Sequence, residues 1–394
     1  MIKKWLLAVA VALLLIALGI PMVGCGPKEA ETIKIGCVLD LSGELAPMGA
    51  KMLDGARLAV EEINADGGVL GKQVELVEED GATDPAKGFD RVKKLVEIDG
   101  VQVIVGPMIT PTSELSIPYA KEHKIPLITM SATGVPLSEL AGTEWYFRTC
   151  LRDDAQGRVL ADVVMDKGYT ALATIVLDST YGKGLEKGIV DGLQEAGWQG
   201  KHVASIRYDI AKKDYRTELQ QIKDSNADVV LAVTYADDGI IIFKQALEMG
   251  LDKIAWLGCD GNYGSGLFKE ASSAEFMEKA IVAGTRTVGS GAVYEKFVPA
   301  YTAKFGAPPE TYCDTTYDAV WAAAKAIKAA GVYDGDAIRA ALVELEFDGA
   351  TGHLSFNEVG DRTSGAFEIW EVVKDATTPT GYRNATIEVV AWSM

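Results

Sequence analysis

Residues 171–208 read ALATIVLDSTYGKGLEKGIVDGLQEAGWQGKHVASIRY, and this stretch decides the fold class. An apolar run at 171–177 is followed by a helical pattern at 184–196 and by a second extended run at 202–208. Strands that are apolar along their length and alternate with helices are typical of parallel sheets that helices cover on both faces. The stretch therefore predicts a strand–helix–strand unit of an α/β protein.

The same alternation extends along most of the chain. The other expected strands lie at 33–39, 74–78, 101–105, 126–130, 228–233 and 254–257, with late extended segments at 367–373 and 387–392. The other expected helices lie at 49–64, 85–98, 113–123, 155–167, 215–225, 239–249, 294–305, 315–330 and near 336–345. Two such blocks are too large for one sheet, so two doubly wound lobes are expected. Ligands of such folds bind beyond the carboxyl ends of the strands, which predicts a site in a shared cleft.

Composition narrows the function classes. The 394 residues are 48% hydrophobic and 24% charged, which excludes intrinsic disorder. Acidic residues outnumber basic ones by 56 to 38, and a net charge of -18 would repel nucleic acid phosphates. No cysteine pair has C-x-x-C spacing and no histidine pair has H-x-x-x-H spacing, so we expect no zinc site and no cofactor.

The N-terminus carries a sorting signal. An uncharged apolar run occupies residues 5–23, after two lysines, and is long enough to span a bilayer. The small residues before Cys25 resemble a bacterial lipoprotein signal, which implies cleavage before Cys25 and a lipid on it. We therefore expect a signal peptide at 1–24 and a tether at 25–32, with an uncleaved membrane anchor as the alternative. Both place the rest of the chain outside the cytoplasmic membrane, in the periplasm or on the outer face.

Four further cysteines lie in this exported part of the chain. They are Cys37, Cys150, Cys259 and Cys313. None are close enough in sequence to suggest a small disulfide-stapled unit, so buried free thiols are expected. One long-range disulfide stays open as an alternative.

Several strings resemble a known family. They are LSG at 41–43, GARLAVEEINADGGV at 55–69, YFRT at 146–149, YGKG at 181–184 and TYDA at 316–319. Together they resemble the type I periplasmic solute-binding proteins that serve branched-chain amino acid (Leu/Ile/Val) ABC importers. The resemblance implies an N-terminal lobe of 33–149 plus 285–362 and a C-terminal lobe of 150–284 plus 363–394, joined by a three-segment hinge.

The resemblance also implies a set of ligand-binding residues. In the first lobe, the positions that match the family's carboxylate site are Thr110, Ser131, Ala132 and Thr133. These residues follow strand ends near helix starts, where free N–H groups and the helix dipole attract an anion. The alternative is that Thr110 and Thr133 are only helix caps or turn formers.

The second lobe is expected to supply the other contacts. Asp260 matches the family's acidic ligand for an ammonium group, although an Asx turn with Gly261 would also explain it. Tyr181 and Tyr235 match positions that lie over the ligand, with core packing as the alternative for Tyr235. Met48 stands where the family often has an aromatic residue, so the specificity for the ligand's side chain stays open.

The resulting hypothesis is a lipid-tethered, monomeric binding protein, without catalytic residues, that delivers an aliphatic amino acid to the permease of an ABC importer. Other small carboxylates, aromatic compounds or amides are alternative ligands of the same fold. A membrane-tethered ligand sensor and a secreted α/β enzyme are the alternatives from other classes. No phosphate loop or nucleophile elbow supports the enzyme.

Overall fold

The computed structural model describes residues 32–394, and residues 33–394 form one compact unit. The predicted signal peptide at 1–24, Cys25 and the tether up to residue 31 lie outside the described residues. Between residues 32 and 394, no helix is both long enough and apolar enough to span a bilayer.

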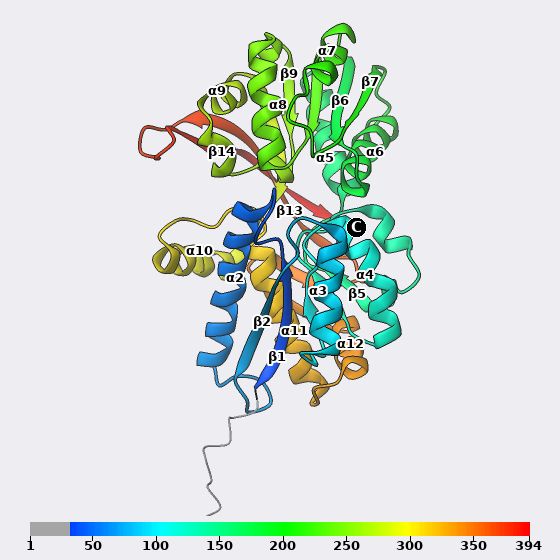
Figure 1. The fold of residues 1–394 in the computed structure, drawn as a ribbon, viewed down its shortest axis with the longest axis vertical. Coiled ribbons are helices and arrows are strands. Elements are labelled where there is room, and N and C mark those ends of the chain that lie inside the picture. The colour runs from blue at the N-terminus through cyan, green and yellow to red at the C-terminus, as the bar shows by residue number, and fades with distance from the viewer. Residues whose placement is uncertain (1–31) are drawn as a thin grey trace, which may run out of the picture. The chain divides into compact units, whose positions relative to one another are not determined.

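The first sheet is parallel throughout and has the order β2-β1-β3-β4-β5. Its strands are β1 (Ile33–Leu39), β2 (Val74–Asp80), β3 (Ile104–Val105), β4 (Leu127–Thr129) and β5 (Tyr146–Arg148). The helices of this lobe are α2 (Ala46–Ala65), α3 (Pro85–Glu97), α4 (Thr110–His123), α10 (Gly291–Phe305), α11 (Cys313–Ala330) and α12 (Gly335–Val343). Helices α2 and α11 pack together, as do α3 and α4. Figure 1 shows the helices around this sheet.

The second sheet has the order β14-β13-β10-β9-β8-β6-β7. Its strands are β6 (Ala171–Leu177), β7 (Lys201–Tyr208), β8 (Val229–Val233), β9 (Ala255–Gly258), β10 (Ile281–Thr287), β13 (Ser364–Lys374) and β14 (Tyr382–Ser393). Its helices are α5 (Asp153–Asp166), α6 (Thr180–Glu195), α7 (Arg216–Asp224), α8 (Ala236–Glu248) and α9 (Ala271–Ala280). Strands β6 to β10 are parallel, whereas β13 and β14 are antiparallel.

Short elements complete the two lobes. The hairpin of β11 (Glu346–Gly349) and β12 (Gly352–Ser355) forms a separate two-stranded sheet. The single-turn helices are η1 (Val135–Glu139), η2 (Thr143–Trp145), η3 (Leu251–Lys253), η4 (Asp260–Asn262) and η5 (Ser265–Lys269). The expected α/β fold with two doubly wound lobes is confirmed, and the C-terminal hairpin makes the second sheet mixed.

Three connections join the lobes. The chain passes between them after β5 (149–152), after β10 (288–290) and after β12 (356–363). The first and third connections are tied by ion pairs on Asp361. Arg148 Nε lies 2.5 Å from one of its carboxylate oxygens, and Arg152 Nη1 lies 2.7 Å from the other. Arg148 and Asp361 are fully buried, so each charge depends on the other for its stability.

Helices α5 and α6 pack unusually close together. A Cβ atom on Gly157 would lie 2.1 Å from the backbone of Gly188, and one on Gly188 would lie 2.5 Å from the carbonyl oxygen of Asp153. Only glycine allows this approach. The packing of α6 against α5 explains the glycines at 184 and 188, since a Cβ atom at either position would meet Asp153.

The four cysteines of the described residues, Cys37, Cys150, Cys259 and Cys313, are buried and free, as expected. Burial raises the pKa of Cys150, Cys259 and Cys313 to about 12. These thiols therefore stay protonated at neutral pH and behave as small apolar side chains.

Candidate functional site

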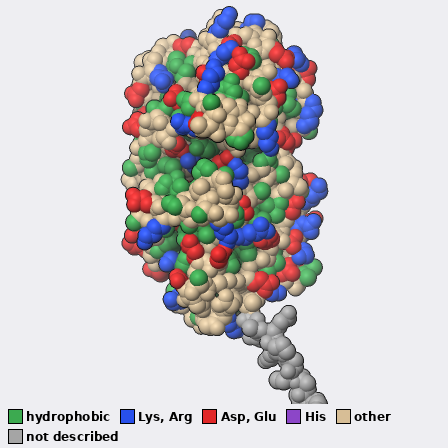
Figure 2. Space-filling view, turned by 90° about the vertical axis from the view of Figure 1, so that its left-hand side faces the viewer, with side chains coloured by type: hydrophobic (Ala, Val, Ile, Leu, Met, Phe, Trp, Pro, Cys, Tyr) green, Lys and Arg blue, Asp and Glu red, His purple; other side chains and the backbone are tan. Residues whose placement is uncertain are grey.

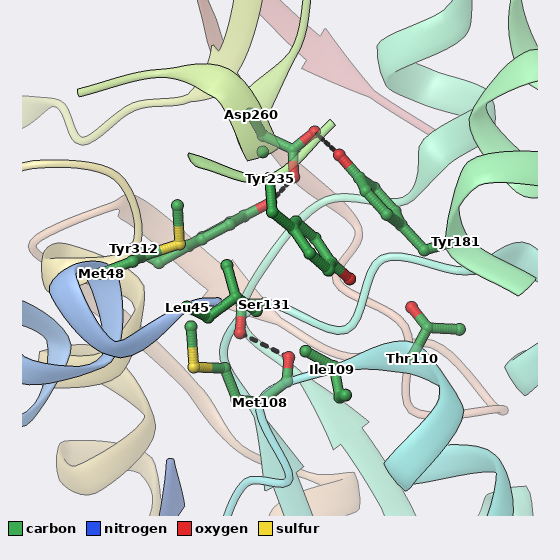
Figure 3. A pocket seen from close by; sticks show the side chains of 11 residues that line it. Leu45, Met48, Met108, Ile109, Thr110, Ser131, Tyr181, Tyr235, Asp260 and Tyr312 are labelled. Carbon is green, nitrogen blue, oxygen red and sulfur yellow. Dashed lines mark hydrogen bonds between the residues drawn. The ribbon is translucent and has the colours of Figure 1, made fainter. Parts of the chain in front are cut away.

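A cavity lies between the two lobes, at the carboxyl ends of strands from both sheets (Figure 3). The loop and helix start after β1, the loops after β3 and β4, and the turn before α11 supply its first-lobe residues. Helix starts after β6, β8 and β9 supply those of the second lobe. The lining residues are Leu45, Met48, Met108, Ile109, Thr110, Ser131, Tyr181, Tyr235, Asp260, Gly261 and Tyr312. The cavity measures about 20 Å³, room for about one water molecule, so the lobes lie close together.

The polar side chains on the first-lobe wall hold two loops together. The Ser131 hydroxyl donates to the carbonyl oxygen of Met108 over 2.7 Å. The Thr110 hydroxyl oxygen accepts from the backbone N–H of Gly134 at 3.3 Å. These bonds fix the loop after β3 against the loop after β4. They also place the first turn of α4, with the positive end of its dipole, at the cavity.

Asp260 is the centre of the second-lobe wall. The Tyr181 hydroxyl donates to its Oδ1 at 2.9 Å, and the Tyr312 hydroxyl donates to its Oδ2 at 2.6 Å (Figure 3). Tyr181 comes from α6 of the same lobe, whereas Tyr312 precedes α11 in the first lobe. The ring of Tyr235 stacks on that of Tyr181 with centroids 5.7 Å apart. Because Tyr312 and Asp260 belong to different lobes, the hydrogen bond between them crosses the cleft.

Burial dominates the electrostatics of this wall. It raises the pKa of Asp260, while the hydrogen bond from Tyr312 opposes the rise. Burial, and next the charge of Asp260, also raise the pKa values of Tyr181 and Tyr312 well above their ordinary value. Both phenols therefore stay protonated and can act as donors to the carboxylate.

Asp153 is a second buried carboxylate, which the sequence analysis missed; it does not line the cavity, but its charge acts on Asp260 and Tyr181, which do. It is the first residue of α5, it is 0% exposed, and its backbone N–H donates to the carbonyl oxygen of Thr133 at 3.1 Å. Among residues 32–394, none makes a hydrogen bond of good geometry to its carboxylate oxygens, although the adjacent Thr133 hydroxyl acts to lower its pKa. Burial, followed by the charge of Asp260, raises its pKa well above the ordinary value. A cation nearby would stabilise its charged form.

The room for Asp153 comes from a glycine. A Cβ atom on Gly184 would lie 2.8 Å from an Asp153 carboxylate oxygen. Gly184 ends the YGKG string that the sequence analysis singled out for Tyr181. Gly184 is therefore needed to make room for the Asp153 side chain, but only the fold shows that the two residues are in contact.

Six of the eight expected ligand-binding residues line the cavity: Met48, Thr110, Ser131, Tyr181, Tyr235 and Asp260. Ala132 and Thr133 are buried and do not line it. The Ala132 carbonyl oxygen accepts from Arg148 Nη1 at 3.2 Å, and no residue in the described part of the chain bonds the Thr133 hydroxyl. Tyr312, which the sequence analysis did not select, has a backbone φ of 67°. A non-glycine residue in this strained region is common at functional sites.

The described residues contain no candidate metal site, and the face seen in Figure 2 carries no large patch of one charge. No group of three or more His, Cys, Asp or Glu side chains between 32 and 394 is placed to hold a metal ion. Figure 2 shows acidic and basic side chains interspersed over one face, without a large region of a single sign.

The chain is similar to known periplasmic binding proteins. A family described as "Periplasmic binding protein" matches residues 32–377. The Leu/Ile/Val-binding protein BraC3 of Rhizobium johnstonii is 30% identical over 362 residues, which cover 88% of this chain and 94% of that protein.

Solved structures share the fold over almost the whole length. The branched-chain amino acid transporter substrate-binding protein LivJ of Streptococcus pneumoniae, in complex with isoleucine, is 27% identical with a TM-score of 0.79. The match covers 92% of this chain and 100% of that one. A solute-binding protein of an ABC transporter from Rhodopseudomonas palustris, in complex with 3,4-dihydroxybenzoic acid, is 24% identical with a TM-score of 0.79, covering 92% and 97%. This chain belongs to the type I periplasmic binding proteins of the branched-chain amino acid receptor family.

Proposed function

We propose that the protein is the substrate-binding component of an ABC importer and that it captures an α-amino acid between its lobes. The observation that carries the ligand class is Asp153. This carboxylate is 0% exposed, and among residues 32–394 the Thr133 hydroxyl alone is directed toward it, outside good hydrogen-bond geometry. A buried, unpaired carboxylate is costly, and a ligand ammonium group nearby would remove that cost.

The other end of the ligand is assigned to the first-lobe wall. The start of α4 at Thr110 and the loop at Ser131 lie at the cavity. N–H groups at a helix start attract an anion, so the ligand's carboxylate belongs there. Ala132 and Thr133 support this loop from behind. An amino acid, anionic at one end and cationic at the other, fits this distribution of charge.

Closure of the lobes would complete the site. The proposed lobes follow the two sheets, so the expected boundary at 284/285 moves to the end of β10: the lobes are 33–149 plus 288–362 and 150–287 plus 363–394, with movement at the three connections. A ligand bound first on one lobe would gain contacts with Tyr181, Tyr235 and Asp260 on closure, and such contacts favour the closed state. The permease would recognise the closed form, and the ligand would leave chemically unchanged.

The remaining parts of the proposal concern the cell. Lipidation at Cys25 and removal of 1–24 would hold the protein at the outer face of the cytoplasmic membrane or in the periplasm. One protomer contains both walls of the cavity, which supports a monomer as the functional unit.

Titration calorimetry tests the ligand class. Leucine, isoleucine and valine are titrated into the purified protein, together with 4-methylpentanoate, the deaminated analogue of leucine. We expect saturable binding of an amino acid, and Asp153→Asn should weaken it far more than binding of the deaminated acid. Saturable binding of no amino acid would reject the proposal.

An aromatic carboxylate is the second candidate, because three tyrosines (Tyr181, Tyr235 and Tyr312) line the cavity. Such a ligand has no ammonium group to meet Asp153. Benzoate and 3,4-dihydroxybenzoate in the same titration distinguish the two classes.

A further inference from the structure

A second, larger cavity adjoins the first one. It measures about 250 Å³ and also lies between the lobes. The two cavities share the residues Leu45, Met48 and Gly261. We call the first the inner cavity and the second the outer chamber. The inner cavity has room for about one water molecule, so space on the scale of an amino acid side chain lies in the outer chamber.

The outer chamber begins apolar and ends polar. Around Met48 its lining includes Pro47, Ala236 and Leu267. Lys51 lies one helical turn beyond Met48 on the same face of α2, and it pairs with Glu310. The hydroxyl of Ser265, from the other lobe, donates to Glu310 Oε1 at 2.7 Å. Neither Lys51 nor Glu310 lines the inner cavity, so this polar end is the remote one.

The charges of the chamber balance. Two carboxylates, Glu44 and Glu310, face two ammonium groups, Lys51 and Lys269. A charged ligand group would upset this balance or compete with the pair of Lys51 and Glu310. An uncharged group that both donates and accepts hydrogen bonds fits without such a conflict.

Thr311 is the second observation that points to a ligand. It lines the outer chamber, it is 1% exposed, and no residue of 32–394 makes a hydrogen bond to its hydroxyl. A buried hydroxyl without a partner costs free energy that a bound polar group would recover. Its neighbour Tyr312 lines the inner cavity, so these two adjacent residues contact the outer chamber and the inner cavity respectively.

We propose that the outer chamber receives the distal side chain of the ligand, which is an amino acid with an unbranched side chain ending in an uncharged hydrogen-bonding group such as a carboxamide. This inference rests on the proposed function, which assigns the α-ammonium and α-carboxylate groups of the ligand to the walls of the inner cavity. Leu45 and Met48 line both cavities, so a side chain reaching from one to the other would pass beside them, where an unbranched chain needs the least room and the methionine can adjust to it.

Gly266 offers a way to fill the chamber alone. A Cβ atom there would lie 3.7 Å from the Cβ of Ala236 and 4.0 Å from that of Pro47, which are ordinary contacts. The residue lines the outer chamber and not the inner cavity. Gly266→Leu therefore removes space from the chamber and leaves the inner cavity unchanged.

The experiment is calorimetric titration of the protein with alanine, leucine, norleucine, asparagine and glutamine. We expect glutamine to bind at least tenfold more tightly than asparagine. Gly266→Leu should weaken glutamine at least tenfold and alanine less than twofold. Thr311→Val should weaken glutamine about fivefold and leave norleucine unchanged. Ser273→Ala, which also removes a buried hydroxyl without a partner among the described residues, should change none of these affinities.

The outcomes separate the two claims. Binding of leucine or alanine without binding of glutamine would overturn this inference and leave the proposed function intact. Unchanged glutamine affinity in folded Gly266→Leu would also overturn it. Binding of no amino acid would reject the proposed function, and the inference with it. Melting curves identify a variant that fails to fold, and the Thr311→Val result then decides.

Discussion

The two walls of the inner cavity use their polar side chains differently. On the first-lobe wall, the hydroxyls of Thr110 and Ser131 bond the backbone of neighbouring loops. On the opposite wall, Asp260 accepts hydrogen bonds from tyrosine hydroxyls of both lobes. The first wall is therefore built before the lobes meet, whereas the second is complete only when Tyr312 reaches it. The ligand should bind to the first wall and be held by the second.

Three buried carboxylates differ in how many hydrogen-bond partners the protein gives them. Asp260 has two tyrosine hydroxyls. Asp40, at the end of β1, accepts from the backbone N–H of Thr83 at 2.9 Å through one oxygen, and no described residue bonds the other. Asp153 has no bond of good geometry within 32–394, and only the Thr133 hydroxyl is directed toward it. The carboxylate with the fewest protein partners is the one most in need of a ligand, and the following variants test this ranking.

Asp153→Asn should have the largest effect. Removing the negative charge should weaken an amino acid about 100-fold, or about 2.7 kcal/mol, because the ammonium group loses a buried carboxylate. The deaminated acid should bind as before. Calorimetry measures both ligands, and Asp154→Asn is the matched control because the adjacent carboxylate is half-buried and bonds Arg152. Equal losses for both ligands would remove Asp153 from the ammonium site.

Asp40→Asn should stabilise the protein at high pH. Burial raises the pKa of Asp40 from 3.8 to about 6. The carboxyl's contribution to stability is therefore fully present below about pH 4 and is lost as the pH rises through about 6. The variant should unfold with a free energy about 2 kcal/mol higher than the parent at pH 8, since the shift is worth about 3 kcal/mol and an unpartnered amide costs about 1 kcal/mol.

Denaturant titrations at pH 4 and pH 8 measure this difference. At pH 4 the parent and the variant should differ by much less than at pH 8. If the difference in unfolding free energy between parent and variant were the same at pH 4 and pH 8, Asp40 would not titrate between these pH values.

Tyr312→Phe should weaken the ligand about tenfold, or about 1.4 kcal/mol, because it removes the hydrogen bond that crosses the cleft to Asp260. Calorimetry measures the affinity, and small-angle scattering measures the compactness without ligand. Tyr301→Phe is the control, since its hydroxyl bonds the carbonyl oxygen of Lys51 inside one lobe. A loss as large in the control would indicate a general packing defect.

Ser131→Ala should have the smallest effect, about threefold, or about 0.7 kcal/mol. It removes the bond to the Met108 carbonyl and loosens the loop that faces the ligand's carboxylate. The amino acid and the deaminated acid should lose affinity equally, because both carry that carboxylate. A loss confined to the amino acid would place the ammonium group on this wall instead.

The local sequence predicted much of the fold. Apolar runs between polar residues give the bounds of β1 and β6 without error. The strand expected at 101–105 is reduced to Ile104–Val105, because only those residues pair with neighbours. Helix α9 and strand β10 were not expected, since no glycine or proline separates the helical residues up to Ala280 from the strand that begins at Ile281.

Candidate site residues at strand ends could be selected from the sequence, whereas those defined by tertiary contacts could not. Tyr181 and Asp260 follow strand ends that the apolar pattern reveals. Asp153 looks like an ordinary acidic residue at a helix start, which favours the helix dipole and needs no ligand. Tyr312 contributes through a φ of 67° and a bond to a residue 52 positions away in the chain, and no local pattern encodes either property.

The ion pairs on Asp361 constrain how the lobes can move. Arg148 and Arg152 lie at the two ends of the first connection, and both form ion pairs with Asp361 of the third connection. The two connections are thereby cross-linked side by side, so neither can slide along the other. Sliding of one lobe across the other would break a fully buried pair, whereas rotation about an axis through the cross-link would keep it. We therefore expect the lobes to bend about this cross-link rather than slide past each other, so that opening the cleft exposes the strand ends to an arriving solute.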